Sequence, residues 1–97
     1  METKTEAERP KVSVIMPVYN AMPYLVKSVD DVLGQSMREI ELICVDDGST
    51  DDSLAALRAY EARDTRVRVL TQKNMFAGVA RNLGIEHANG DYFMFLD

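Results

Sequence analysis

Ile40-Glu41-Leu42-Ile43-Cys44-Val45-Asp46-Asp47-Gly48 is the most informative stretch of the sequence. It is a largely apolar run of strand length that ends in two adjacent carboxylates. Such a run predicts a strand that is covered on both faces of a sheet. Neighbouring carboxylates repel each other, and partial burial favours protonation of one of them. Asp46 and Asp47 therefore point to a ligand that needs acceptors, such as a base, a sugar or a metal. Turn and cap chemistry leading into Gly48 is the alternative for the pair alone.

Strands and helices are predicted to alternate on both sides of this stretch. The expected elements are a strand at 12–16, a helix from Pro23 to a stop at Gly34, a strand at 40–45, a helix capped by Ser49 or Thr50, a strand at 67–70, a helix at 77–88 and a strand at 91–96. This order predicts a parallel sheet with helices on both faces. The fold class is therefore α/β, a Rossmann-like three-layer sandwich of four strands and about three helices.

Polar residues are expected to cap the beginning of the second helix, and a glycine is expected to let the third helix pack closely on the sheet. Ser49 and Asp52 are spaced as in a capping box, and Asp51 and Asp52 are expected in the first turn, where the helix dipole favours negative charge. In the third helix, Gly84 is expected to allow close contact between helix and sheet.

The composition excludes some classes of protein. Hydrophobic residues make up 46% of the 97 residues, which is enough for the core of one small domain. The net charge of -5 argues against a sequence-independent nucleic-acid binder, which needs a basic face. It does not argue against a nucleotide ligand, because a divalent cation can neutralise a diphosphate. Cys44 is the single cysteine, so no disulfide can form within the chain, and a small buried hydrophobe is expected there.

The first ten residues lack the apolar core of a signal peptide. Residues 1–10 are polar and charged and are expected to be flexible, so the domain is placed at 11–97. No segment approaches the roughly 18 apolar residues of a membrane span. We expect a cytoplasmic protein and leave open an association with the inner face of the membrane through parts of a longer parent.

Three polar strand ends are predicted to share one rim of the sheet. Residues 17–20 follow the first strand, Asp46 and Asp47 end the second, and Asp97 ends the fourth. Parallel sheets bind ligands at this rim, near the point where strand order reverses. The loop at 18–22 contains none of the glycines of a dinucleotide fingerprint, so a bound diphosphate would need a divalent cation held by carboxylates.

Four blocks of this sequence resemble the family 2 glycosyltransferases, which have the GT-A fold. The blocks are Val12-Ser13-Val14-Ile15-Met16-Pro17-Val18-Tyr19-Asn20, Glu41-Leu42-Ile43-Cys44-Val45-Asp46-Asp47-Gly48-Ser49-Thr50-Asp51, Asn74-x-x-x-Gly78-x-Ala80-Arg81-Asn82-x-Gly84-Ile85, and Gly90-Asp91-Tyr92 with Phe95-Leu96-Asp97. They cover residues 11–97, in the family's order and spacing. The resemblance implies a nucleotide-sugar donor, most often a UDP-sugar, and transfer of the sugar to an unknown glycan or lipid acceptor.

The resemblance also implies roles for single residues. Pro17 and Tyr19 would flank the base, with Tyr19 as the stacking platform and Val18 between them. Asp47 would accept a hydrogen bond from the ring N–H of uracil, and Asp46 would support the loop.

Further residues of the nucleotide site are implied in the second half of the chain. Gly78 and Arg81 belong to the third block, where Arg81 would approach the nucleotide or brace the acidic loop. Asp97 matches the first acid of the family's Asp-x-Asp motif, which holds the ribose and, through Mn²⁺ or Mg²⁺, the diphosphate. The second acid, the catalytic base and the acceptor-binding half would lie beyond residue 97, as if the domain were truncated within the motif. We therefore expect the 97-residue chain to be inactive by itself.

Two other classes fit part of the pattern. A phosphoacceptor receiver domain is also α/β with clustered acids, but its acidic pair follows the first strand rather than the second. A non-catalytic interaction module is the other alternative, because the fourth strand would leave an apolar sheet edge exposed. Pairing through that edge would give a homodimer.

Overall fold

The structure, a computed structural model, describes residues 9–96. Strands and helices alternate through this part of the chain. They are β1 (Val12–Val18), α1 (Tyr24–Leu33), β2 (Ile40–Asp46), α2 (Ser53–Arg63), β3 (Val67–Thr71), α3 (Phe76–His87) and β4 (Tyr92–Phe95). The strands are parallel and lie in the order β3-β2-β1-β4. The predicted α/β class and order of elements are confirmed.

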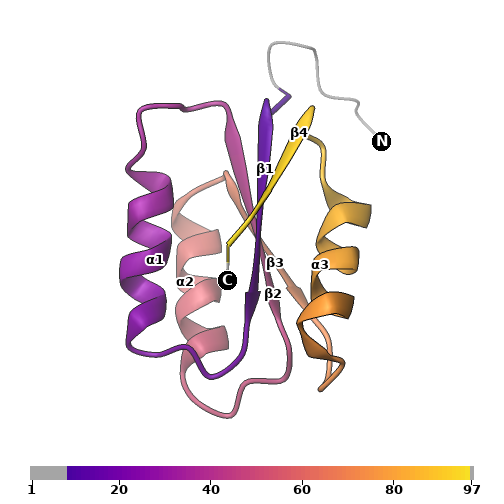
Figure 1. The fold of residues 1–97 in the computed structure, drawn as a ribbon. Helices are drawn as coiled ribbons and strands as arrows, with labels where there is room; N and C mark the ends of the chain where they lie inside the picture. Colours follow the sequence, from indigo (N-terminus) through magenta and orange to yellow (C-terminus); the bar gives the residue numbers. More distant parts are fainter. Residues whose placement is uncertain (1–8, 97) are drawn as a thin grey trace.

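The helices cover the two faces of the sheet unequally (Figure 1). α1 and α2 pack on one face through a core that includes Leu25 and Leu57, and α3 packs on the other face around Ile15, Ile43 and Ala80. The chain first builds outward from β1 to β2 and β3, and α3 then brings it back to place β4 on the far side of β1. The strand order therefore reverses beside β1, which is where open α/β sheets bind ligands.

The apolar runs produce the centre of this sheet. All seven residues of β2 are buried, as the continuous run predicted. On α1, Leu25, Val29 and Val32 form a buried stripe with the spacing of one helical face. Cys44 is a free, fully buried thiol, and burial raises its pKa to about 12, so the thiol stays protonated at neutral pH.

The beginning of α2 differs from the prediction. The helix begins at Ser53 with Asp52 as its N-cap, and neither Ser49 nor Thr50 caps it. Asp51 and Asp52 precede the first turn instead of lying in it, so the predicted capping box is wrong. The Asp51 carboxylate accepts a hydrogen bond from the Ser53 amide at 2.9 Å. The hydroxyls of Ser49 and Thr50 are held instead by the loop after β1, a partner that local sequence does not reveal.

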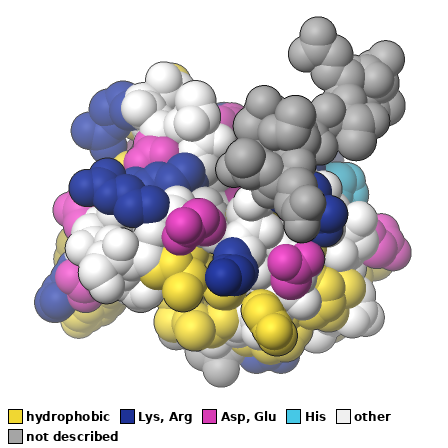
Figure 2. Space-filling view, turned by 90° about the horizontal axis from the view of Figure 1, so that it is seen from above, with side chains coloured by type: hydrophobic (Ala, Val, Ile, Leu, Met, Phe, Trp, Pro, Cys, Tyr) yellow, Lys and Arg dark blue, Asp and Glu magenta, His cyan; other side chains and the backbone are white. Residues whose placement is uncertain are grey.

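The strand β4 is an exposed apolar edge, as the interaction-module alternative predicted, although its apolar run by itself predicted a strand covered on both faces. Its four side chains are 44–67% exposed, because α3 packs chiefly on β1 and β2. Figure 2 looks onto the amino ends of the strands and shows hydrophobic side chains gathered along one edge of the molecule. Homodimer formation through β4 stays a prediction that light scattering in solution can test.

A buried carboxylate organises the amino end of the sheet, opposite the expected ligand rim. Glu41 is 5% exposed, and its Oε2 accepts hydrogen bonds from the Ser13 hydroxyl and the Asn89 amide, each at 2.6 Å. Its Oε1 lies 3.4 Å from the Arg68 guanidinium. These contacts satisfy a costly buried charge and fix the turn from α3 into β4.

Two glycines of α3 give a matched test of the predicted close packing. A Cβ atom at Gly84 would lie 2.5 Å from Cγ2 of the buried Ile15, whereas one at Gly78 would meet no atom within 4 Å. We predict that Gly84→Ala destabilises the fold by about 1–3 kcal/mol through overpacking. Gly78→Ala should stabilise it by up to about 1 kcal/mol, because alanine favours helix. Urea unfolding measures both changes, and equal midpoints for the two variants would contradict the packing.

Candidate functional site

The loop after β1 is fastened to the loop after β2 by the side chain of Asn20. Asn20 has a positive φ of 48°, and its amide N–H donates to the Ser49 hydroxyl at 2.9 Å. Its Oδ1 accepts hydrogen bonds from the amides of Thr50 at 2.7 Å and Asp51 at 3.2 Å. These contacts fix the backbone next to Tyr19, whose side chain is 53% exposed.

Two further hydrogen bonds extend this connection toward α1. The Ala21 amide donates to the hydroxyl of the buried Ser53 at 2.9 Å. The Met22 amide donates to Oδ2 of Asp51 at 3.2 Å. The carboxyl ends of β1 and β2 therefore carry one connected layer of loops, at the lower end of Figure 1.

The carboxylate of Asp47 holds the amino end of α3. Its Oδ1 accepts hydrogen bonds from the Met75 amide at 2.7 Å and from Nε2 of Gln72 at 3.2 Å, and its Oδ2 accepts one from the Phe76 amide at 3.0 Å. The hydrogen bond from the Met75 amide is the main reason that the pKa of Asp47 lies below its usual value. A carboxylate offers about four acceptor positions, and residues 9–96 occupy three of them, so within this part of the chain one position of Oδ2 stays available to a ligand.

A hollow opens beside this carboxylate. It has a volume of about 380 Å³ and is lined by Tyr19, Asp47, Asn74, Phe76 and Ala77. This size lies in the range of about 300–1,000 Å³ that is usual for small-molecule sites. Aromatic side chains can contact the face of a flat ring, and a carboxylate can accept a hydrogen bond from an N–H group on its edge. The lining therefore suits a planar ring that carries an N–H donor.

Tyr19 and Asp47 are the two predicted site residues that line this hollow. They come from separate segments, the loop after β1 and the residue directly after β2. Val18 and Asp46 are each 2% exposed, so their side chains do not reach it. Pro17 is half-buried within β1.

Asp46 contacts the following loop rather than the hollow. Its Oδ2 accepts a hydrogen bond from the Ser49 amide at 3.1 Å, and within residues 9–96 its buried Oδ1 has no hydrogen-bond partner. This position suits the supporting role that the resemblance implies.

The remaining predicted residues lie outside the hollow. Gly78 is exposed and Arg81 half-buried on α3, and neither lines it. Asp97 lies outside the described residues, so its role as a metal ligand stays a prediction. Residues 9–96 contain no group of three or more His, Cys, Asp or Glu side chains that would hold a metal ion.

Three residues line the hollow although no site role was predicted for them: Asn74, Phe76 and Ala77. Phe76 and Ala77 fill unspecified positions of the third block. A usable signal was the pair Met75-Phe76, two large apolar residues directly after the polar Lys73-Asn74. Met75 is 50% exposed and Phe76 is 80% exposed, so neither of these large apolar side chains is used to fill the hydrophobic core.

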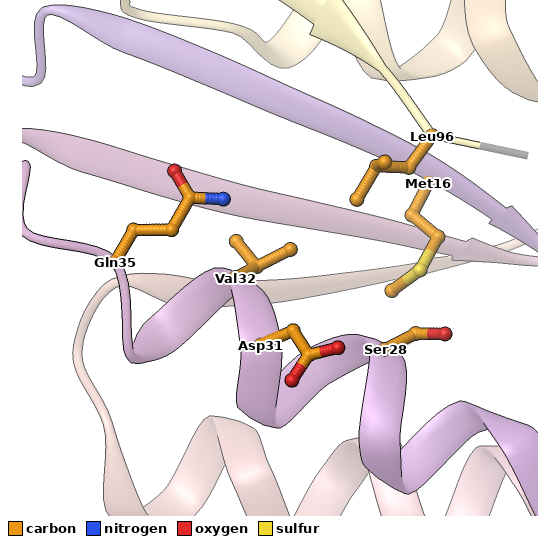
Figure 3. A pocket seen from close by; sticks show the side chains of 6 residues that line it. All are labelled: Met16, Ser28, Asp31, Val32, Gln35 and Leu96. Atoms are coloured by element: carbon orange, nitrogen blue, oxygen red, sulfur yellow. The ribbon is translucent and has the colours of Figure 1, made fainter.

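A second, smaller hollow of about 200 Å³ lies between α1 and the sheet (Figure 3). Met16, Val32 and Leu96 supply apolar side chains, and Ser28, Asp31 and Gln35 supply polar ones. It lies on the face of the sheet that α1 covers, opposite α3. No role was predicted for it.

Comparison with known proteins places this chain and its fold in a family. The family model of glycosyl transferase family 2 matches residues 13–97, and the chain belongs to that family. An uncharacterized glycosyltransferase of Haemophilus influenzae is 47% identical over 89 residues, which cover 91% of this chain and 36% of the relative. The chain therefore spans about a third of the length of this relative, and 29% of the length of the glycosyltransferase GlyG of Streptococcus pneumoniae, to which it is 46% identical.

Solved structures agree with the predicted GT-A fold. Staphylococcus aureus TarS 1-349 in complex with UDP-GlcNAc has a TM-score of 0.81 at 30% identity, over 90% of this chain and 26% of that one. The mannosyltransferase PcManGT from Pyrobaculum calidifontis, in complex with GDP-Man and Mn²⁺, has a TM-score of 0.73 at 27% identity, over 82% of this chain and 25% of that one. Among residues 9–96, no helix has the length and apolar character needed to cross a membrane.

The hydrogen bonds from the amino end of α3 to the Asp47 carboxylate predict a pH-dependent contribution to the stability of the fold. Because folding lowers its pKa, the contribution is present above the unfolded pKa of about 3.9 and is lost as the pH falls through the folded value. Asp47→Asn should therefore lower the free energy of unfolding at pH 7 and cost less at pH 3, which lies below the unfolded pKa. Urea unfolding at both pH values measures this difference. The control is Glu86→Gln, at an exposed position of α3. An equal cost of Asp47→Asn at both pH values would contradict a stabilising role for the Asp47 carboxylate at the amino end of α3.

Proposed function

We propose that this chain binds the nucleoside diphosphate part of a nucleotide-sugar donor, most simply a UDP-sugar, with the base in the hollow at the carboxyl ends of β1 and β2. The observation that carries the proposal is the convergence of Tyr19 and Asp47, from separate segments, on one hollow of about 380 Å³. The donors named in the complexes of TarS and the mannosyltransferase support it.

The proposed contacts follow from the chemistry of the two side chains. The exposed ring of Tyr19 offers a stacking surface, and base stacking on an aromatic side chain is worth about 1–3 kcal/mol. The remaining acceptor position on Oδ2 of Asp47 suits the ring N–H of uracil. The hydrogen bonds around Asn20 and Asp47 hold both groups in place before the ligand arrives, which reduces the entropic cost of binding.

We also propose that the parent enzyme uses Mn²⁺ or Mg²⁺ at the diphosphate. Within residues 9–96 the structure contains no suitable cluster of ligands, so the proposal depends on Asp97 and on a second acid of the family's motif. The Mn²⁺ named in the mannosyltransferase complex supports it. A divalent cation would offset the charge that develops on the departing diphosphate.

The longer parent protein is proposed to transfer the sugar to a glycan or lipid acceptor, in the cytoplasm or at the inner face of the membrane. The described residues supply no assigned catalytic base, and the 97-residue chain is proposed to be inactive. Release of UDP from UDP-sugars by the purified chain would contradict this, and fractionation of cells that produce the parent tests its location. Membership in the transferase family rules out the receiver-domain alternative.

Isothermal calorimetry tests the proposed base site. With Mn²⁺ present, UDP should bind weakly, in the millimolar range, and Tyr19→Ala should weaken binding by about tenfold because the stacking surface is lost. Tyr24→Ala is the matched control, because Tyr24 is 79% exposed on α1 and does not line the hollow. Absence of heat at millimolar UDP, or equal effects of the two variants, would count against the site.

Base discrimination tests the proposed role of Asp47. Cytosine presents a ring acceptor where uracil presents its N–H, so an acceptor on Asp47 should favour UDP over CDP by about tenfold. Asp47→Asn can present an amide donor and should reduce this preference. Competition between UDP and CDP for the wild-type chain and the variant gives the ratio, and an unchanged ratio in Asp47→Asn would remove the proposed role.

A further inference from the structure

Phe76 adopts a backbone conformation that its side chain disfavours. Its φ of 70° lies in the left-handed region, which glycine occupies freely and a bulky side chain rarely does. Its ring is 80% exposed, so packing against the core does not explain why an aromatic residue stands there. A strained residue that contributes little to the core is a reason to look for a role in binding.

The protein holds this strained backbone from both sides. The Phe76 amide donates to Oδ2 of Asp47 at 3.0 Å, and the Phe76 carbonyl accepts from Nε2 of Gln72 at 3.2 Å. Gln72 also donates to Oδ1 of Asp47 at 3.2 Å, so the three residues form one closed set of hydrogen bonds. The backbone of Phe76 is therefore held by the same carboxylate that the proposed base site uses.

Phe76 and Tyr19 line the same hollow, together with Asp47. We infer that Phe76 is a second aromatic contact for the base of the donor, in addition to Tyr19. The inference rests on the proposed function, because it takes the hollow to hold a nucleobase. Contact with the base would remove an exposed apolar ring from water and would explain why the chain keeps a phenylalanine where glycine fits the backbone better.

This role makes a prediction that separates base binding from phosphate binding. An aromatic ring contributes through the face of the base and has no attraction for a diphosphate. Loss of the ring should therefore weaken the binding of uridine and of UDP by the same factor. The binding of inorganic pyrophosphate with Mn²⁺ should stay unchanged.

Calorimetry on the complete 97-residue chain tests the inference with three variants. Phe76→Ala keeps a Cβ atom and removes the ring, and it should weaken uridine and UDP binding by about tenfold. Phe76→Tyr keeps an aromatic face and should bind both ligands within about twofold of the wild type. Phe76→Gly relieves the backbone strain, so its urea midpoint should be equal to or higher than that of Phe76→Ala.

The outcomes distinguish this inference from the proposed function. Unchanged uridine and UDP binding in Phe76→Ala, while Tyr19→Ala still weakens both, would overturn the inference and leave the base site in place. A wild-type chain that binds neither uridine nor UDP would overturn both. A tenfold loss for pyrophosphate as well would also overturn the inference, because it would show that Phe76 supports the fold of the site rather than contacting the base.

Discussion

The carboxylate of Asp47 is the contact on which the rest of the site depends. It stands at the end of the most buried strand and accepts hydrogen bonds from amides 28 and 29 residues further along the chain. Those two amides lie at the amino end of α3, where a backbone N–H has no partner within the helix, and Asp47 supplies the acceptor for both. One side chain therefore joins the centre of the sheet to the helix on its far face and orients the segment that lines the hollow.

A second set of contacts performs the same task for the other wall. Asn20 takes a left-handed conformation and uses its side-chain carbonyl oxygen to bind the loop after β2. Since both walls are tied to β2 and its following loop, the hollow is formed before any ligand binds. The amino end of the sheet is organised separately by the buried Glu41, so the two ends of the strands have independent polar networks.

The layers of this fold follow from local patterns, and the site follows from them only in part. The apolar runs of β1 and β2 and the stripe on α1 are sufficient to predict a parallel sheet with its ligand rim, because burial alone sets them. The beginning of α2 was predicted wrongly, since Ser49 and Thr50 bind Asn20, a partner from another loop. The cap that Asp47 provides for α3 and the strained Phe76 depend on tertiary contacts, which no pattern within one segment contains.

Tyr19, Asp47 and Phe76 line one hollow at the carboxyl ends of the strands, and we propose that this hollow binds the base. The most direct measurement is a titration of the ¹⁵N-labelled chain with uridine, followed by amide chemical shifts in NMR spectra. The claim predicts that the largest changes fall in residues 19–22, 47–50 and 74–78, while residues 39–41 and 88–91 at the amino ends stay unchanged. Changes centred on the hollow beside α1, at Ser28, Asp31 and Gln35, would contradict it.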